Sequence, residues 1–196
     1  MAGRESLTDA GWLLKVLVRA AVLAVTAAGS SVPMHGCEKP GNKAPATATP
    51  PATSPVTIAG KTFTLECALL PSKQFRGLSG RTDIPADGGM IFVFPRAEER
   101  YFVMRDCPVD IDIIFLDAQM KITKFHEMKV EPPRSAEETP NDTRGVNDKY
   151  ESRLARYHSG FPAQYALEFK GGTIKGLNLK EGQKIDIDPD LKRWAR

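Results

Sequence analysis

Residues 101–117 of the chain read YFVMRDCPVDIDIIFLD and contain the pattern on which the architecture depends. Two apolar runs, 101–103 and 111–116, indicate buried strands. Charged residues lie between and within these runs, namely Arg105, Asp106, Asp110 and Asp112. A charged side chain is seldom fully buried unless it is paired, so this stretch predicts either structural ion pairs or a functional site.

The residues on either side predict further strands. Residues 62–69 alternate between apolar and polar, as a half-buried strand does, and 90–94 form a continuous apolar run ended by Pro95, as a strand covered on both faces does. A short helix is expected at 71–76, where proline comes early and glycine follows. Other strands are expected at 100–105, 111–117, 121–128, 165–169 and 183–187. The expected fold is therefore mainly β, a compact antiparallel β sandwich or roll with one or two short helices.

Residues 1–36 have the layout of a secretory signal peptide. Arg4, Lys15 and Arg19 precede a short apolar run at 20–28. That run is too short to span a bilayer, which needs about twenty residues. An uncleaved N-terminal anchor is the alternative, and it would place two of these cations inside the membrane.

The segment that follows indicates attachment to a membrane. Residues 32–37 resemble a bacterial lipoprotein box because Gly36 directly precedes Cys37, which makes Cys37 a lipidation candidate. In the alternative, cleavage near Ala28 leaves Cys37 as an incidental thiol. Residues 37–55 are rich in Pro, Ala and Thr and predict a disordered tether. We therefore expect an exported protein, attached to the membrane by a lipid or an N-terminal anchor and facing the periplasm or exterior.

Residues 56–196 have the size and pattern of a single domain. Within it, 131–157 is polar and proline-rich, and predicts a long excursion with partial disorder and a helical patch near 148–157. The net charge of the whole chain is +3, and basic residues are interleaved with acidic ones. This pattern argues against a nucleic-acid partner.

The domain contains two cysteines, Cys67 and Cys107. In an exported protein they could form a disulfide, because the compartment permits oxidation. The alternative is two separate thiols, with Cys67 buried as a small hydrophobic residue.

Asp110 and Asp112 are two residues apart, so on a regular strand both would point to the same face. Paired carboxylates can raise each other's pKa, hold a cation or act in acid/base catalysis. The alternative is a solvated strand edge or a partner for Arg105. His126 and His158 lack the spacing of a metal motif, and we expect no metal and no cofactor.

Arg76 and Arg105 have guanidinium groups that suit a carboxylate or phosphate. If they converge, the domain could bind a small anionic or sugar-like ligand. In the alternative each arginine pairs with an internal acid, such as Asp112 or Glu168 for Arg105.

Six blocks of the domain are similar to domain of unknown function family 192. They are RGL at 76–78, GMIFVF at 89–94, FVMRD at 102–106, DIIFLD at 112–117, PAQYALE at 162–168 and LKEG at 179–182. The resemblance implies a compact β-rich fold, often found in exported or lipid-anchored bacterial proteins, without an established activity. The residues that it singles out match Arg76, Gly77, Met104, Arg105, Asp112 and the segment 157–168.

The sequence also departs from the family pattern. Val103 stands where tryptophan is usual, Asp110 occupies a common proline position, and His158 stands where proline is frequent. If a family pocket stacks a ligand on that tryptophan, this chain lacks the ring.

These observations together predict a binding or accessory module of the cell envelope, and not an enzyme. Its partner would be a small anionic or sugar-like ligand, or an envelope protein. The ligand-binding candidates are Arg76, Met104, Arg105, Asp106, Asp110, Asp112, Tyr157 and Glu168. Two alternatives stay open: a hydrolase that uses Asp110 or Asp112 with Arg105, and a purely structural domain.

Overall fold

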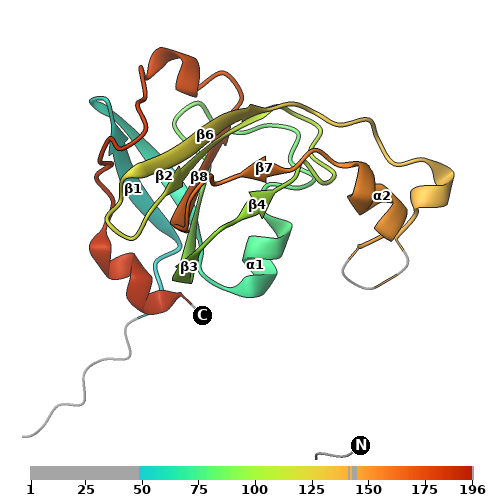
Figure 1. Ribbon diagram of the computed structural model, residues 1–196, viewed down its shortest axis with the longest axis horizontal. Coiled ribbons are helices and arrows are strands. Elements are labelled where there is room, and N and C mark those ends of the chain that lie inside the picture. Colours follow the sequence, from blue (N-terminus) through green and yellow to red (C-terminus); the bar gives the residue numbers. More distant parts are fainter. Residues whose placement is uncertain (1–48, 141, 143–144, 196) are drawn as a thin grey trace, which may run out of the picture. The chain divides into compact units, whose positions relative to one another are not determined.

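A computed structural model describes residues 49–140, 142 and 145–195 of the chain (Figure 1). The expected signal peptide, Cys37 and most of the expected tether lie outside the described residues. Within them, no helix has the length and apolar character needed to cross a membrane.

The described residues form one six-stranded sheet and a small two-stranded sheet. The larger sheet has the order β1-β2-β3-β8-β5-β6 and pairs antiparallel throughout, except between β2 and β3, which are parallel. Its strands are β1 (Thr53–Ile58), β2 (Lys61–Ala68), β3 (Met90–Glu98), β5 (Ile111–Leu116), β6 (Ile122–Met128) and β8 (Ala163–Lys170). The smaller sheet pairs β4 (Tyr101–Phe102) with β7 (Tyr157–His158).

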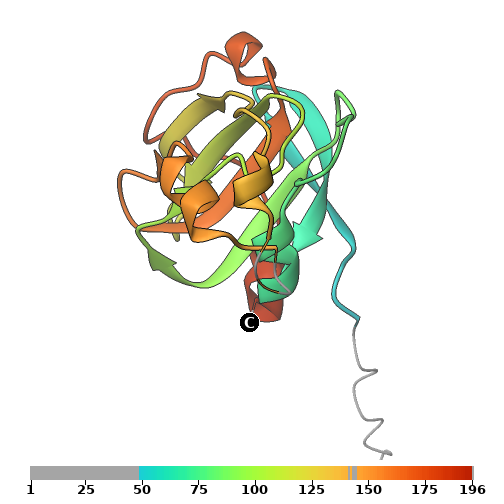
Figure 2. The ribbon, with the colours of Figure 1, turned by 90° about the vertical axis from the view of Figure 1, so that its right-hand side faces the viewer.

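The C-terminal segment connects the two edges of the large sheet. Asp186 bridges to Thr57 on β1, and Lys184 bridges to Lys121 just before β6. The strand expected at 183–187 is therefore a pair of isolated bridges. The sheet curls into a roll, as the view in Figure 2 shows, and the prediction of a mainly β sandwich or roll is confirmed.

Apolar side chains fill both faces of the central strands. Alternate residues of β3 point to opposite sides, so Ile91 and Val93 enter one cluster while Met90, Phe92 and Phe94 enter another. We call these the first core and the second core. This double burial explains why the sequence of β3 is a continuous apolar run.

Short helices cover the ends of the roll. They are α1 (Pro71–Arg76), η1 (Ala136–Glu138), α2 (Asp148–Arg153), η2 (Ile174–Gly176) and η3 (Pro189–Trp194). The helix expected at 71–76 is confirmed. Pro71 stands in its first turn, and Gly77 ends it with a φ of 53° that favours glycine.

Three strand boundaries differ from expectation. The strand expected at 100–105 is only two residues long, because the chain turns at Asp106, which has a φ of 51°. Strand β3 continues past Pro95. Its pairing with β8 shifts register between Val93 and Glu98, and in this irregular part the missing backbone N–H of proline breaks no regular strand-to-strand hydrogen bond. Strand β1 begins at Thr53, inside the segment expected to be a tether.

The described residues of the excursion, 131–140, 142 and 145–157, contact one another and the body of the domain, and the expected partial disorder of the segment stays a prediction. Arg134 donates two hydrogen bonds to the Asp106 carboxylate, at 2.7 and 2.9 Å, and its guanidinium lies 3.9 Å from the centre of the Tyr150 ring. Arg153 donates to Glu138 at 2.7 Å. These contacts tie the described residues of the excursion to one another and to the body of the domain, despite the polar composition of the segment.

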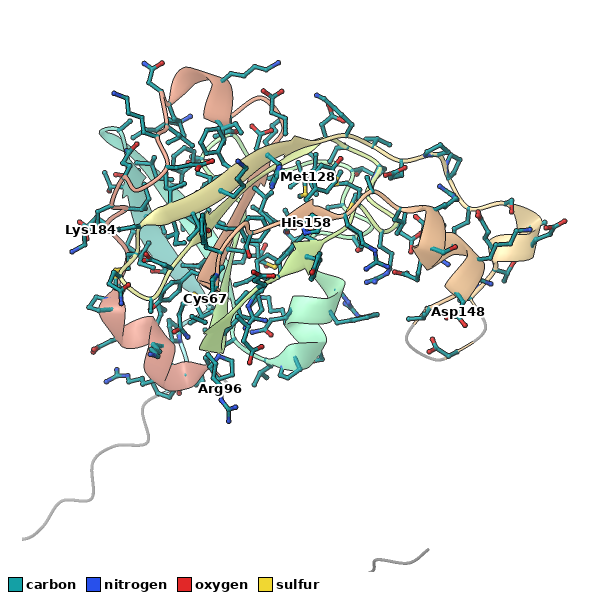
Figure 3. All side chains as sticks on the ribbon, viewed as in Figure 1. Cys67, Arg96, Met128, Asp148, His158 and Lys184 are labelled. Carbon is teal, nitrogen blue, oxygen red and sulfur yellow. The ribbon has the colours of Figure 1, made fainter. Side chains whose placement is uncertain are left out.

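The possible disulfide between Cys67 and Cys107 is not formed, and the alternative of two separate thiols, with Cys67 buried, describes the structure. Both are free thiols, Cys67 on β2 in the first core (Figure 3) and Cys107 in the second core. Since the two cores occupy opposite faces of the sheet, the sulfur atoms have no route to each other. Burial raises the pKa of Cys67 to about 11 and that of Cys107 to about 12, so both are protonated at neutral pH.

Gly89 provides a test of the packing between β3 and β8. A Cβ atom at Gly89 would lie 2.0 Å from the backbone oxygen of Glu168, so Gly89→Ala has to push the two strands apart. We expect its free energy of unfolding to fall by about 3 kcal/mol or more in urea denaturation. Gly172→Ala is the matched control, because Gly172 also has a positive φ but open space around it. Equal losses for the two variants would contradict the packing argument.

Candidate functional site

A pocket of about 390 Å³ opens beside the second core, between α1, the end of β3 and β4. Its walls are largely aromatic and its rim is charged. It is lined by Gln74, Phe75, Arg76, Gly77, Leu78, Ser79, Phe92, Phe94, Glu99, Arg100, Tyr101, Phe102, Val103, Arg105, Cys107 and Glu168.

Glu168 is the one carboxyl group among these residues that is buried. It lies in the middle of β8, paired across the sheet with Met90 on one side and Ile113 on the other, and it is 5% exposed. Its Oε2 atom is buried and accepts no hydrogen bond from any described residue. Burial raises the pKa of Glu168 to about 8, so the group is mostly a neutral acid at pH 7.

The backbone of Gly77 passes directly over this carboxyl group. A Cβ atom placed on Gly77 would stand 3.6 Å from Glu168 Oε2 and 3.4 Å from the Phe92 ring. Absence of a side chain at this position therefore leaves room above the acid. Val103 also lines the pocket.

Arg76 and Arg105 both line the pocket, which is the convergence that the anion-site hypothesis required, but the two guanidinium groups differ in availability. Arg76 is exposed, and no side chain among the described residues pairs with it. Arg105 donates to both carboxylate oxygens of Glu151, at 2.5 and 2.8 Å, and its guanidinium lies 4.4 Å from the centre of the Phe75 ring. Arg76 is therefore the cation that is free to meet a ligand.

The partner of Arg105 corrects the sequence interpretation. Neither Asp112 nor Glu168 pairs with it; Glu151 of α2 does, and this ion pair holds the pKa of Arg105 above its usual range. The signal was hard to see because Glu151 lies 46 residues away in a segment expected to be partly disordered.

Asp110 and Asp112 do not form a carboxylate pair. Asp110 accepts from Lys129 Nζ at 2.8 Å and from the Val130 amide at 3.0 Å. Asp112 is buried and accepts from the Ile174 amide at 2.8 Å, and burial raises its pKa. Each carboxylate has its own structural partner, and neither lines the pocket.

Three further candidates lie outside the pocket. Met104 is buried in the second core, and Asp106 pairs with Arg134. The Tyr157 hydroxyl accepts from the Lys129 amide at 3.3 Å. Of the eight candidates, the structure thus brings together Arg76, Arg105 and Glu168, and gives the others structural contacts elsewhere.

The two histidines of the domain do approach each other, through β6 and β7. The ring Nε2 of His126 lies 2.7 Å from the backbone oxygen of His158, so it contacts the main chain and not the second ring. The His158 ring instead packs on Tyr101, with the centres 4.5 Å apart.

Sequence reasoning missed most of the pocket wall. Phe75 and Tyr101 are 41% and 52% exposed at the mouth, and Phe102 packs edge-on against Phe92 with the ring centres 5.0 Å apart. Arg100 was also missed; its guanidinium lies 3.6 Å from the centre of the Phe94 ring. The available signal was Phe75, the aromatic residue of the short helix at 71–76. A helix of six residues buries few side chains, so an aromatic ring on it indicates a role outside the core.

The model of family DUF192, described as "Uncharacterized ACR", matches residues 54–187. The chain belongs to this family. The resemblance inferred from the six sequence blocks is thereby confirmed. None of the curated proteins compared with the DUF192 chain matches it.

Two crystal structures have a similar fold. A protein from Sinorhizobium meliloti, described as a candidate transcription regulator, is 26% identical with a TM-score of 0.51; the similarity covers 69% of this chain and 91% of that one. A protein of unknown function from Novosphingobium aromaticivorans is 24% identical with a TM-score of 0.52, covering 68% and 83%. The DUF192 chain therefore shares its architecture with one protein described as a candidate regulator and one described as of unknown function.

The contact between Arg105 and Glu151 predicts an energetic coupling between the pocket rim and the excursion. The two side chains are 18% and 20% exposed, and their two-point contact is geometrically strong. In a double-mutant cycle of Arg105→Ala and Glu151→Ala, we expect a coupling of about 1–2 kcal/mol in the free energy of unfolding. Additive losses in free energy of unfolding would show that the pair contributes no stability. Lys149→Ala is the control: Lys149 is on the same helix and pairs with Glu137, so its loss should add to that of Arg105→Ala without coupling.

The pKa of Glu168 predicts how stability depends on pH. Its folded pKa of about 8 exceeds the ordinary value of 4.5, so the folded state binds the proton more tightly than the unfolded state. This contribution to stability is complete below about pH 4.5 and is lost as pH rises through 8, at up to about 1.4 kcal/mol per pH unit between these values.

Glu168→Gln replaces the ionisable carboxyl group with a neutral amide of nearly the same shape. We expect the difference in free energy of unfolding between this variant and the natural chain to change steadily in the variant's favour from pH 5 to pH 8, measured by urea denaturation. Parallel stability curves across that range would contradict the assignment of a buried neutral acid.

Proposed function

We propose that this DUF192 domain is a binding module for a small organic ligand, and that the N-terminal segments hold it at the cell envelope. The observation that carries the proposal is the Glu168 carboxyl group, which is buried at the wall of an open pocket without a partner among the described residues. Buried polar groups are nearly always hydrogen-bonded, because leaving one unpaired destabilises the fold. A ligand in the pocket would supply the missing partner.

A structural role accounts less well for Glu168. Its neighbours across the sheet are apolar, so methionine or leucine would fill the same place without an unpaired acid. The acid therefore costs stability that packing alone does not require. Such a cost is typical of a functional site.

The alternative hydrolase built on Asp110 or Asp112 with Arg105 has little geometric support. Asp110 pairs with Lys129, Asp112 with the Ile174 amide and Arg105 with Glu151, which places the three groups in separate contacts. A general acid and base must reach the same substrate.

The envelope location rests on the sequence of residues 1–55. The basic and apolar order of 1–36, the lipoprotein-like Cys37 and the polar tether support an exported, membrane-attached protein. We do not extend the description of the Sinorhizobium meliloti protein to this chain, because basic and acidic residues are interleaved along the sequence.

A thermal-shift screen of the natural chain tests the binding function. The screen should include sugars, organic acids, sugar phosphates, amines and uncharged aromatic compounds. A ligand present at a hundred times its Kd stabilises a fold by about 2.7 kcal/mol, which raises the Tm by several degrees. We expect at least one class to produce such a shift, and we expect Glu168→Met to fold normally and to show a clearly smaller shift.

Glu181→Gln is the control variant, because Glu181 is an exposed acid paired with Lys124 and does not line the pocket. It should respond to ligands as the natural chain does. A natural chain that responds to no class of compound would contradict the binding function.

A further inference from the structure

We infer that the pocket binds an organic anion end-on, with a neutral hydroxyl or carbonyl oxygen against Glu168 and a carboxylate or phosphate at Arg76. This inference rests on the proposed binding function and adds the chemical class of the ligand and its orientation. The shared features of the class are an oxygen at one end and an anionic group at the other, as in sugar acids, sugar phosphates and hydroxy acids.

The inner end of the pocket favours an uncharged oxygen. Glu168 lies between Met90 and Ile113, and no cationic side chain among the described residues contacts its carboxyl group. Its raised pKa means that the group presents an O–H donor at neutral pH. A hydroxyl or carbonyl oxygen can accept this hydrogen bond without introducing a charge into an apolar wall.

The mouth of the pocket favours an anion. Arg76 is exposed and has no side-chain partner among the described residues, whereas Arg105 is engaged by Glu151. Arg100 is partly engaged, since it donates to the backbone oxygens of Ala163 and Arg96 at 3.1 and 2.8 Å. The free guanidinium at the rim is therefore that of Arg76, and it can bind a carboxylate or phosphate by two parallel hydrogen bonds.

The same rim disfavours a cationic ligand. Arg76, Arg100 and Arg105 line the mouth, while Glu99 is the one rim acid, and Glu151 is already paired. An ammonium group would also have to displace the proton of Glu168 before it gained an ion pair. An amine at the inner end is therefore the competing class that the experiment has to exclude.

The walls set the shape of the ligand. Phe75 and Tyr101 flank the opening, and the rings of Phe92 and Phe102 close the inner side. A cavity of about 390 Å³ accommodates a single ring or a short chain. Gly77 lies beside Glu168 and the Phe92 ring, so the ligand meets backbone and not a side chain at this position.

A matched set of probes tests the two ends separately on the natural full-length chain. The probes are glucuronate, glucose 6-phosphate and 4-hydroxybenzoate, which have both groups; glucose and phenol, which lack the anion; benzoate, which lacks the hydroxyl; and glucosamine, which is cationic. Isothermal titration calorimetry measures each Kd at pH 6.5. We expect at least one two-ended anion to bind. A counterpart that lacks one of the two ends should bind about tenfold more weakly or worse.

Two variants assign the ends. Arg76→Gln should weaken the two-ended anion about tenfold or more and leave the counterpart without the anion unchanged. Glu168→Met should remove the preference for the hydroxyl, while Glu168→Gln, which keeps a neutral donor, should retain most of it. Loss of binding in Glu168→Gln as complete as in Glu168→Met would contradict the hydrogen bond from a neutral acid.

The pH dependence separates the inferred class from an amine. Affinity for a two-ended anion should fall above pH 8, by up to about tenfold per pH unit, because ionised Glu168 no longer donates and repels the ligand. If the affinity for glucosamine, the amine probe, instead rises as Glu168 ionises near pH 8, a cation pairs with Glu168 and the inferred class is wrong.

Failure of this inference is distinguishable from failure of the binding function. Binding of glucosamine or of other amines in preference to the anions, with loss in Glu168→Met, would overturn the ligand class and retain the binding module. Absence of binding by every two-ended anion in the set would also overturn the ligand class, whereas the broad thermal-shift screen decides the binding function.

Discussion

The burial of β8 on both faces is the constraint from which the rest of the domain follows. All its residues from Ala163 to Phe169 are buried, and the strand pairs with β3 on one side and β5 on the other. One of these residues is a glutamate. A carboxyl group in that place cannot keep its charge at neutral pH without a partner, so the protein carries a neutral acid in its wall.

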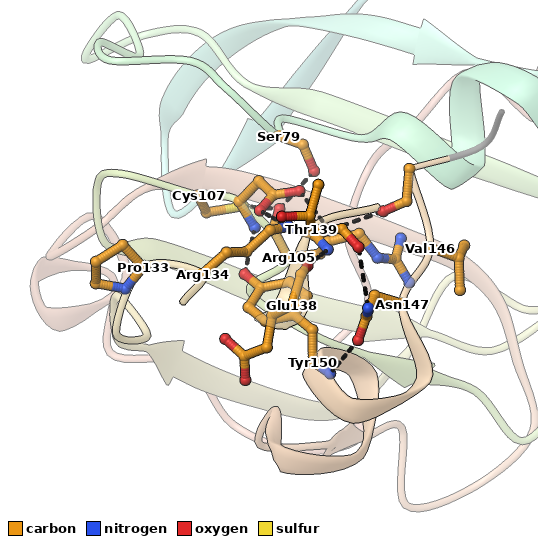
Figure 4. Close-up of polar contacts among 12 residues, drawn as sticks. Ser79, Arg105, Cys107, Pro133, Arg134, Glu138, Thr139, Val146, Asn147 and Tyr150 are labelled. Atoms are coloured by element: carbon orange, nitrogen blue, oxygen red, sulfur yellow. Dashed lines mark hydrogen bonds and ion pairs between the residues drawn. The ribbon is translucent and has the colours of Figure 1, made fainter. Parts of the chain in front are cut away.

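The structure around Glu168 places this buried acid in the lining of the pocket. The chain passes over it at Gly77, where a larger residue would close the space, and then turns so that the Ser79 hydroxyl donates to the Arg105 backbone oxygen at 2.7 Å. The Ser79–Arg105 contact is drawn in Figure 4. The Arg105 side chain in turn binds Glu151 of the excursion. The helix, the turn after β4 and the excursion are thus connected in one set of contacts beside the pocket.

The sequence predicted the fold well because apolar periodicity reports burial directly. The continuous run at 90–94 and the alternation at 62–69 correspond to β3 and β2, and the helix at 71–76 follows from its proline and glycine. The strand expected at 100–105 was too long, since nothing in the local pattern shows that Asp106 adopts a positive φ. Long-range pairing also leaves no local signal, as Arg105 and Glu151 illustrate.

The site was predictable only in part. Arg76, Arg105 and Glu168 were among the candidates, but so were Asp110 and Asp112, whose spacing suggested a pair. Proximity along one strand did not decide their chemistry, because each carboxylate found a different partner. Glu168 stands out only when its neighbours on β3 and β5 are known, and these come from residues far away in the sequence.

The central claim is that Glu168 is a buried neutral acid at physiological pH, and its carboxyl carbon tests this most directly. A ¹³C NMR titration of the natural chain, with the resonance assigned from Glu168→Gln, measures the pKa of this group alone. The account predicts a midpoint near 8. A midpoint near the ordinary value of 4.5 would show that the carboxylate is charged and solvated, and would contradict both the neutral acid and the site built on it.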